Sequence, residues 1–207
     1  MNKLIRPILL LSLTAILFAC NKQERIYTPA DAHSHNDYKQ SVPFYRAYDA
    51  GFGSIEADVF AVNGQLMVAH EEKEITPERS LKIMYINPLI KKLKQDTARR
   101  LRLLIEIKAD YTTTLPLVVE ELKPLSQYFD YPGHPGRLWI VITGKVPPGA
   151  VMLNYPAWMS FDVDHMDGFT PQQFTKIGLI SVPFDKYFKW SGAGELPEKG
   201  AMRVPGR

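Results

Sequence analysis

The stretch SIEADVFAV, residues 54–62, decides how the rest of the sequence is interpreted. It is rich in apolar and β-branched residues, and the turn Asn63-Gly64 joins it to a second apolar segment, residues 65–70. This pattern predicts a strand followed by a tight hairpin. Because side chains alternate across a strand, Glu56 and Asp58 point to the same face. An ionised carboxylate on a buried face is costly unless it meets a cation or another partner.

Strand-like and helix-like segments alternate on both sides of this hairpin. Further strands are predicted to end near residues 31–33 and to cover residues 103–108, 138–143, 158–162 and 179–183. Helices are predicted over residues 41–50, 77–94, 115–129 and 171–177, with breaks near Pro88 and Pro124. Strands that alternate with helices favour a parallel sheet.

Polar residues follow the apolar part of most predicted strands, as they do on the active face of a (β/α)8 barrel. The predicted fold class is therefore α/β, of the TIM-barrel type, over residues 29–190. Such barrels run to about 250 residues, whereas this chain has 207 residues and about six candidate strands on its main sheet. We therefore expect an incomplete barrel that lacks its C-terminal βα units, followed by an irregular tail, residues 191–207.

The N-terminus has the layout of a bacterial lipoprotein signal. A basic start precedes an apolar run that is too short to span a bilayer, and Cys20 follows a small residue. We expect a signal peptide over residues 1–19, lipidation of Cys20 and a short tether over residues 20–28. These features predict a lipid-anchored protein of the bacterial cell envelope, held at the membrane. An ordinary signal peptide with a chance cysteine is the alternative.

Composition narrows the classes of function. The net charge of the whole chain is +3, with no long basic run, which gives no support for nucleic acid as a partner. Cys20 is the single cysteine, so no thiol remains for a disulfide, a metal site or catalysis once it is lipidated.

Oxygen ligands gather at the predicted strand ends. Glu106, on the next strand, could join Glu56 and Asp58, and Asn36 could add a neutral oxygen. Such hard ligands suit Ca²⁺ or Mg²⁺ better than zinc. The segment DVDHMDG, residues 162–168, also carries acidic residues, but its spacing departs from that of an EF-hand loop. We therefore interpret it as a strand-end loop.

Two histidines and a lysine lie near these ligands in the predicted fold. Imidazole titrates near neutral pH, so His35 and His70 could serve as a general base and a general acid. Lys108 could face an anionic group such as a phosphate, and Tyr38 is expected to pack beside the site. A solvated strand-end charge is the plainer interpretation of Lys108.

Four segments together resemble a known superfamily: HSHNDY at residues 33–38, SIEADV at 54–59, the later His70, and IEIK at 105–108. They look like the phospholipase C-like phosphodiesterases, which include phosphoinositide-specific phospholipase C and glycerophosphodiester phosphodiesterase. HSHNDY with RSLKIMYINPL, residues 79–89, is similar to one branch of that superfamily, found in bacteria and fungi.

The resemblance implies a metal-dependent phosphoric diester hydrolase acting on small-molecule or lipid phosphodiesters, such as glycerophosphodiesters or phospholipids. It implies that His35 and His70 are the catalytic histidines and that Lys108 contacts the phosphate. The implied metal ligands are Asn36, Glu56, Asp58 and Glu106.

Three alternatives remain open. The glycerophosphodiesterase pattern, which lacks its usual arginine here, places His33 rather than His35 in the catalytic position. The pair His33 and His35 also fits an amidohydrolase-like metal hydrolase, in which a His-x-His motif holds the metal. The third alternative is an inactive, lipid-anchored binding or remnant domain, which the short C-terminus favours.

Overall fold

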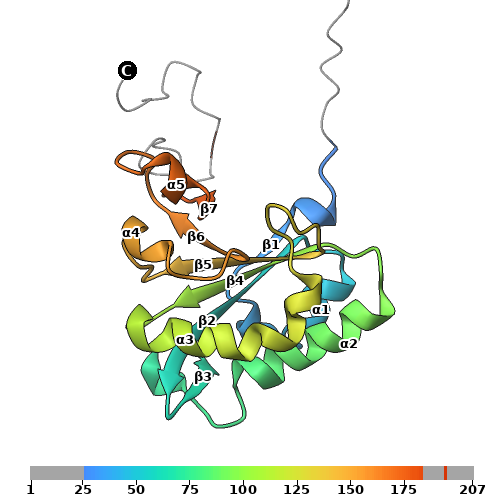
Figure 1. Ribbon diagram of the computed structural model, residues 1–207. Helices are drawn as coiled ribbons and strands as arrows, with labels where there is room; N and C mark the ends of the chain where they lie inside the picture. Colours follow the sequence, from blue (N-terminus) through green and yellow to red (C-terminus); the bar gives the residue numbers. More distant parts are fainter. Residues whose placement is uncertain (1–25, 184–193, 195–207) are drawn as a thin grey trace, which may run out of the picture.

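The computed structural model describes residues 26–183 and residue 194 (Figure 1). The predicted signal peptide, Cys20 and most of the predicted tether and tail lie outside the described residues. Among the described helices, none is long and apolar enough to cross a membrane.

The core of the fold is a curled sheet of six parallel strands with one antiparallel addition (Figure 1). The parallel strands, in spatial order, are β1 (His33–Ser34), β2 (Ser54–Val62), β4 (Leu101–Ile107), β5 (Leu138–Gly144), β6 (Met159–Val163) and β7 (Ile177–Ile180). The short strand β3 (Gln65–Val68) pairs antiparallel with β2. The α/β class and the parallel sheet are therefore confirmed, and the described strands are compatible with part of a (β/α)8 barrel.

The helices differ more from the predictions than the strands do. They are α1 (Tyr45–Asp49), α2 (Asn87–Gln95), α3 (Tyr111–Leu122), α4 (Gly149–Met152) and α5 (Pro171–Phe174). The helix predicted to begin at Ser41 is only five residues long, and the one predicted over 171–177 only four. The helix predicted over 115–129 begins earlier, at Tyr111, and changes to a 3-10 helix at Lys123.

The predicted break at Pro88 takes the form of a change in helix type. A π-helical segment, Lys82–Ile86, leads into α2, and Pro88 lies in the first turn of α2. Proline has no amide hydrogen to donate, and its ring crowds the carbonyl of the preceding turn. The wider π turn before Pro88 is one of the recognised ways in which a helix accommodates such a residue. Residues 77–80, predicted as helix, lie outside it.

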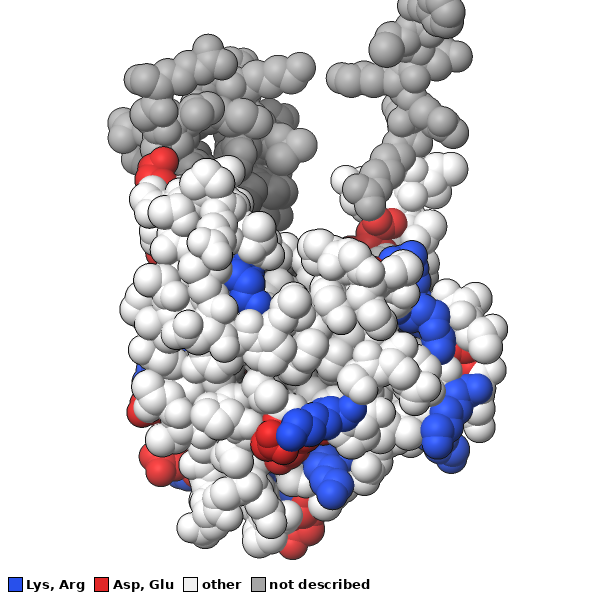
Figure 2. All heavy atoms as spheres, in the orientation of Figure 1, with Lys and Arg blue, Asp and Glu red and all other residues white. Residues whose placement is uncertain are grey.

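One face of the sheet is apolar, and the other carries polar side chains together with buried Leu104 and Val141. On the apolar face, Ile55, Ala57 and Val59 of β2 are fully buried, as are their neighbours on β4 and β5. They form one core with apolar side chains of α2 and α3. The alternate side chains of β2, among them Glu56 and Asp58, point to the opposite face. The surface seen in Figure 2 carries acidic and basic side chains in small mixed groups.

A buried carboxylate holds the loop after β1 in place. Asp37 has no exposed surface, and its two oxygens accept hydrogen bonds from the Ser34 hydroxyl (2.8 Å), the Phe44 amide (2.5 Å) and the Tyr85 hydroxyl (3.0 Å). Burial, followed by the charge of Asp37, raises the pKa of Tyr85, so this hydroxyl stays protonated and donates. Asp37 therefore ties the HSHNDY segment to the π-helical segment.

We predict that Asp37→Asn lowers the free energy of unfolding by about 3 kcal/mol. The side-chain amide of the asparagine would place N–H donors where the hydroxyl and backbone N–H groups around Asp37 need an acceptor. Urea denaturation measures the change. Asp49→Asn is the matched control, since Asp49 is exposed and pairs with Lys92 at the surface, and surface pairs contribute about 0–1 kcal/mol. Equal losses in the two variants would contradict the structural role of Asp37.

Candidate functional site

Three carboxylates of neighbouring strands converge at the polar face of the sheet. Glu56 and Asp58 alternate along β2, and Asp58 pairs in register with Glu106 of β4. One oxygen of each carboxylate lies within 4.8 Å of the others. Glu56 is 5% exposed and Asp58 is fully buried. The sequence therefore placed these three residues together correctly.

Asp58 uses its two oxygens differently. Its Oδ2 lies 2.8 Å from the Tyr38 hydroxyl, 3.1 Å from His70 Nδ1 and 3.2 Å from Lys108 Nζ. Its Oδ1 is buried and has no hydrogen-bond partner within the described residues. A buried carboxylate oxygen without a partner carries a desolvation cost. An oxygen in this state is suited to a cation.

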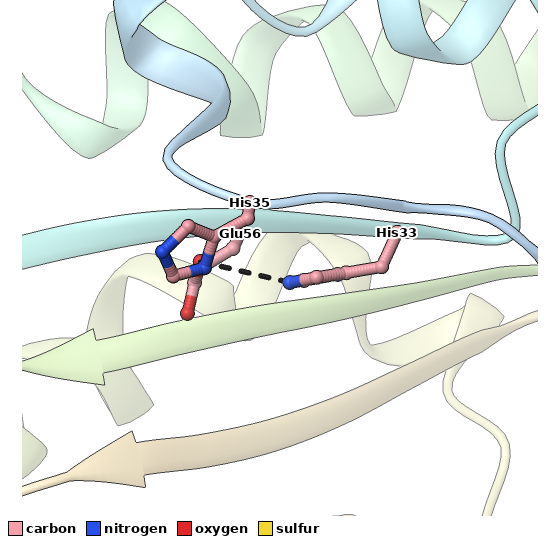
Figure 3. Close-up of side chains that lie close together, drawn as sticks. All are labelled: His33, His35 and Glu56. Atoms are coloured by element: carbon pink, nitrogen blue, oxygen red, sulfur yellow. Dashed lines mark ion pairs between the residues drawn. The ribbon is translucent and has the colours of Figure 1, made fainter. Parts of the chain in front are cut away.

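Glu56 is surrounded by donors. His35 Nδ1 lies 2.7 Å, the Asn36 amide 3.1 Å and His33 Nε2 3.6 Å from its Oε2, and Figure 3 shows both imidazole rings beside the carboxylate. Burial raises the pKa of Glu56, but the contacts with His33, Asn36 and His35 outweigh it and hold the pKa below its usual value. Glu56 therefore stays ionised.

The hydroxyl of Tyr38 links the loop after β1 to the site. It lies 2.8 Å from Asn36 Oδ1, 2.8 Å from Asp58 Oδ2 and 3.2 Å from His70 Nδ1. Burial, followed by the hydrogen bond to Asp58, raises the pKa of Tyr38, so the hydroxyl remains protonated. The sequence placed Tyr38 beside the site but not at the centre of its hydrogen bonds. Asn36, two residues before Tyr38, has a left-handed backbone with φ of 49°.

Lys108 lies between two of the carboxylates. Its Nζ is 3.1 Å from Glu106 Oε1 and 3.2 Å from Asp58 Oδ2. Burial and then the charge of Asp58 raise the pKa of Glu106, and Lys108 opposes this only in part. Burial lowers the pKa of Lys108, but the contacts with the two carboxylates outweigh it and raise the pKa overall. The ammonium group is therefore charged at neutral pH and faces the site.

Two groups of side chains could hold a metal ion among the described residues, and Glu56 belongs to both. One group is Glu56, Asp58 and Glu106; the other is His33, His35 and Glu56. The first group offers only oxygen, which suits Mg²⁺ or Ca²⁺, and it contains the unpartnered oxygen of Asp58. The second group contains two imidazoles, which suit zinc or another transition metal.

Comparisons with known proteins point to a phosphodiesterase-like family. A family model described as an AIM6-like phosphodiesterase domain matches residues 21–100. A protein named altered inheritance of mitochondria protein 6 homolog, from Arthroderma benhamiae, is 35% identical over 156 residues, covering 60% of this chain and 50% of that protein. Altered inheritance of mitochondria protein 6 from Kluyveromyces lactis is 31% identical over 167 residues, covering 60% and 40%.

The chain thus spans half or less of the length of these curated relatives. No solved structure matches it. The description of the family model suggests a phosphodiesterase-like function, in agreement with the motifs in the first hundred residues. The matched segment includes His33, His35, Glu56, Asp58 and His70.

The predicted location in the bacterial cell envelope is wrong. The curated relatives are fungal proteins, and their names refer to the inheritance of mitochondria. The short basic and apolar N-terminus that led to this prediction is a weak signal, because several kinds of targeting segment share that composition.

The opposite pKa shifts of Glu56 and Glu106 predict opposite effects of neutralising them in the metal-free protein. A carboxyl whose pKa is lower in the folded than in the unfolded protein stabilises the fold above its unfolded pKa, and this stabilisation is lost as the pH falls through the folded pKa. A carboxyl whose pKa is higher in the folded protein instead destabilises the fold at pH values above its folded pKa. At pH 7 with a chelator, Glu106→Gln should therefore raise the melting temperature by about 2–4 °C, the shift expected for 1 kcal/mol.

Glu56→Gln should lower the melting temperature under the same conditions. Both differences should shrink in acid, as the wild-type carboxyls become protonated. Calorimetry as a function of pH measures them, and the exposed Glu120→Gln provides the baseline. Shifts of the same sign in the two site variants would contradict the electrostatics described here.

Proposed function

We propose that this chain is a metal-dependent phosphoric diester hydrolase that uses histidines for proton transfer and acts on glycerophosphodiester or phospholipid-type substrates. The observation that carries the proposal is the convergence of the Glu56, Asp58 and Glu106 carboxylates beside the cationic Lys108 and two histidines. The resemblance to the phospholipase C-like superfamily and the description of the matching family model support the same chemistry.

The three carboxylates would hold Mg²⁺ or Ca²⁺, with the Asn36 carbonyl oxygen as a further ligand. A bound cation supplies positive charge that lowers the pKa of a nearby hydroxyl and offsets negative charge on the phosphoryl group. Asn36 Oδ1 accepts from Tyr38 in the structure, and a carbonyl oxygen has two lone pairs, so it can do both. Lys108 would contact a phosphoryl oxygen from the β4 side of the site.

Proton transfer falls to two histidines that are oriented by carboxylates. His70 Nδ1 faces Asp58, and His35 Nδ1 faces Glu56. Because a carboxylate only accepts, we assign the Nδ1 proton to each contact, which leaves Nε2 for the reaction. One ring would take the proton of the attacking hydroxyl as its oxygen bonds to phosphorus. The other would protonate the leaving oxygen as its bond to phosphorus breaks.

The contacts of His33 favour His35 as the histidine that transfers protons. His33 has both ring nitrogens engaged, Nδ1 with the Ser54 hydroxyl at 2.9 Å and Nε2 with Glu56. The side chain of His35 is 69% exposed and that of His33 is 36% exposed. His35 is thus the more accessible to substrate, and His33 would act as a positioning residue for Glu56.

We expect His35→Asn and His70→Asn to lower kcat by about 10²–10⁴-fold, the usual effect of removing a general acid or base. His33→Asn should cost about tenfold or less and leave the pH profile of kcat unchanged in shape. Hydrolysis of bis(p-nitrophenyl) phosphate and of glycerophosphodiesters measures both effects. A fall in kcat through His33→Asn as large as the fall through His35→Asn would contradict this assignment of roles.

Lys108→Met should separate metal binding from turnover. It removes a positive charge close to the proposed cation, so Mn²⁺ should bind roughly tenfold more tightly. Catalysis should fall, because the phosphoryl group loses its contact with the ammonium. Isothermal titration and kinetics measure the two effects. Weaker metal binding in this variant would show that the cation does not lie beside Lys108.

A second candidate function rests on the cluster of His33, His35 and Glu56. It is an amidohydrolase-like metal hydrolase in which the His-x-His pair holds a transition metal. The two functions differ in which variants abolish metal binding. Asp58→Asn and Glu106→Gln should abolish Mg²⁺ or Ca²⁺ binding if the diesterase proposal holds, whereas His33→Asn should abolish Zn²⁺ binding under the alternative. Diester hydrolysis by the metal-loaded wild type, with none by Asp58→Asn, is the direct test of the proposal.

A further inference from the structure

Arg79 is a charged residue that the proposed mechanism does not use, yet it contacts the site. It belongs to the segment between β3 and the π-helical segment, and its side chain is partly buried. Its Nη2 donates to the backbone carbonyl of Tyr38 at 2.7 Å. Its guanidinium carbon lies 5.8 Å from the centre of the Tyr38 ring. Arg79 therefore contacts both the backbone and the ring of the residue whose hydroxyl joins the groups of the site.

The backbone of Arg79 contacts a second segment of the site. Its carbonyl accepts a hydrogen bond from the amide of Val68, the last residue of β3, at 2.6 Å. The next amide, that of Ala69, donates to the Asp58 carbonyl at 3.3 Å, and His70 follows. Arg79 thus lies where the loop after β1 and the end of β3 meet. Each of these segments places a side chain against Asp58 Oδ2, Tyr38 from the first and His70 from the second.

The contacts of the guanidinium are not those of an ordinary structural arginine. Its hydrogen bond goes to a neutral carbonyl rather than to a carboxylate, and its Nε is buried without a hydrogen-bond partner among the described residues. A buried donor without an acceptor carries a desolvation cost. Packed apolar side chains often stabilise a fold as well as buried charged groups do. What Arg79 adds to packing is its hold on Tyr38.

The position of Tyr38 decides which oxygen of Asp58 is free. The Tyr38 hydroxyl lies 2.8 Å from Asp58 Oδ2, whereas Oδ1 has no hydrogen-bond partner in the described part of the chain. The hydroxyl stands at the end of the side chain farthest from the backbone. A small movement of the backbone or ring of Tyr38 would therefore displace it and let the Asp58 carboxylate turn.

We propose that Arg79 is a positioning residue, which holds Tyr38 so that its hydroxyl occupies Asp58 Oδ2 and leaves Oδ1 to the metal ion. The inference rests on the proposed metal-dependent function and adds to it a residue that contacts neither the metal nor the substrate. Positioning and charge act in opposite directions here. The positive charge of Arg79 by itself repels a nearby cation, whereas its hold on Tyr38 favours binding of the cation.

Titration of the full chain with Mn²⁺ separates the two effects by their sign. Arg79→Met should weaken Mn²⁺ binding by about tenfold, as expected for a residue that orients metal ligands. Arg79→Lys keeps the charge and a donor for the Tyr38 carbonyl, so it should recover part of the affinity. Arg100→Met is the matched control, since Arg100 is exposed and pairs with Asp130, and it should leave the affinity unchanged. Unchanged or tighter binding in Arg79→Met would overturn the proposal.

The Tyr38→Phe background tests whether Arg79 acts through the Tyr38 hydroxyl. Tyr38→Phe alone should weaken Mn²⁺ binding. Adding Arg79→Met to it should then weaken binding by no more than about twofold, because the group that Arg79 positions is already absent. If the two losses multiply instead, Arg79 acts independently of the hydroxyl and the proposal is wrong.

Crystal structures of the metal-free variants separate this inference from the proposed function. In Arg79→Met the Tyr38 hydroxyl should lie beyond hydrogen-bond distance of Asp58 Oδ2, while in Arg100→Met it should stay in place. If this displacement is seen but the wild type neither binds Mn²⁺ nor hydrolyses diesters, Arg79 positions Tyr38 and the proposed function is wrong. If the wild type hydrolyses diesters and Tyr38 does not move in Arg79→Met, the function stands and Arg79 is not a positioning residue.

Discussion

The burial of Glu56 and Asp58 side by side on one strand is the constraint on which the structure depends. Two negative charges on a covered sheet face are unfavourable unless donors or a cation compensate them. The chain supplies donors from three directions: the loop after β1, the second residue after β3 and the residue after β4. Each of these places carries one side chain that contacts a carboxylate. His35 contacts Glu56, whereas His70 and Lys108 contact Asp58.

The donors compensate the negative charge of these carboxylates only in part. Asp58 Oδ1 remains without a partner in the described part of the chain, and the pKa of Glu106 is raised by burial and by Asp58. A site that served only stability would be better built from neutral, packed residues. Residual negative charge next to accessible histidines is typical of sites that bind a cation and move protons.

The strands and most of the site could be predicted from the sequence because both depend on simple periodicity. Alternation along residues 54–62 placed Glu56 and Asp58 on one face, and parallel order placed Glu106 beside them. The role of Asp37 could not be predicted, since no periodic pattern links it to the Phe44 amide, and its partner Tyr85 lies 48 residues along the chain and meets it only in the folded structure. The left-handed backbone of Asn36, two residues before the centrally placed Tyr38, is likewise not revealed by periodicity.

The comparisons and the structure cover different parts of the proposed site. The family model ends at residue 100, before Glu106 and Lys108. The register of β4 against β2 joins these later residues to the matched segment. The structure thus joins residues that lie beyond the segment matched by the family model to the same site.

The central claim is that the carboxylates of β2 and β4, and not the histidine pair, hold the cation. Pulsed electron paramagnetic resonance of the protein loaded with Mn²⁺, a metal that binds oxygen sites, tests it most directly. We expect one bound Mn²⁺ with no coupling to a directly bonded nitrogen, and loss of binding in Asp58→Asn. A strong nitrogen coupling that disappears in His33→Asn would contradict it.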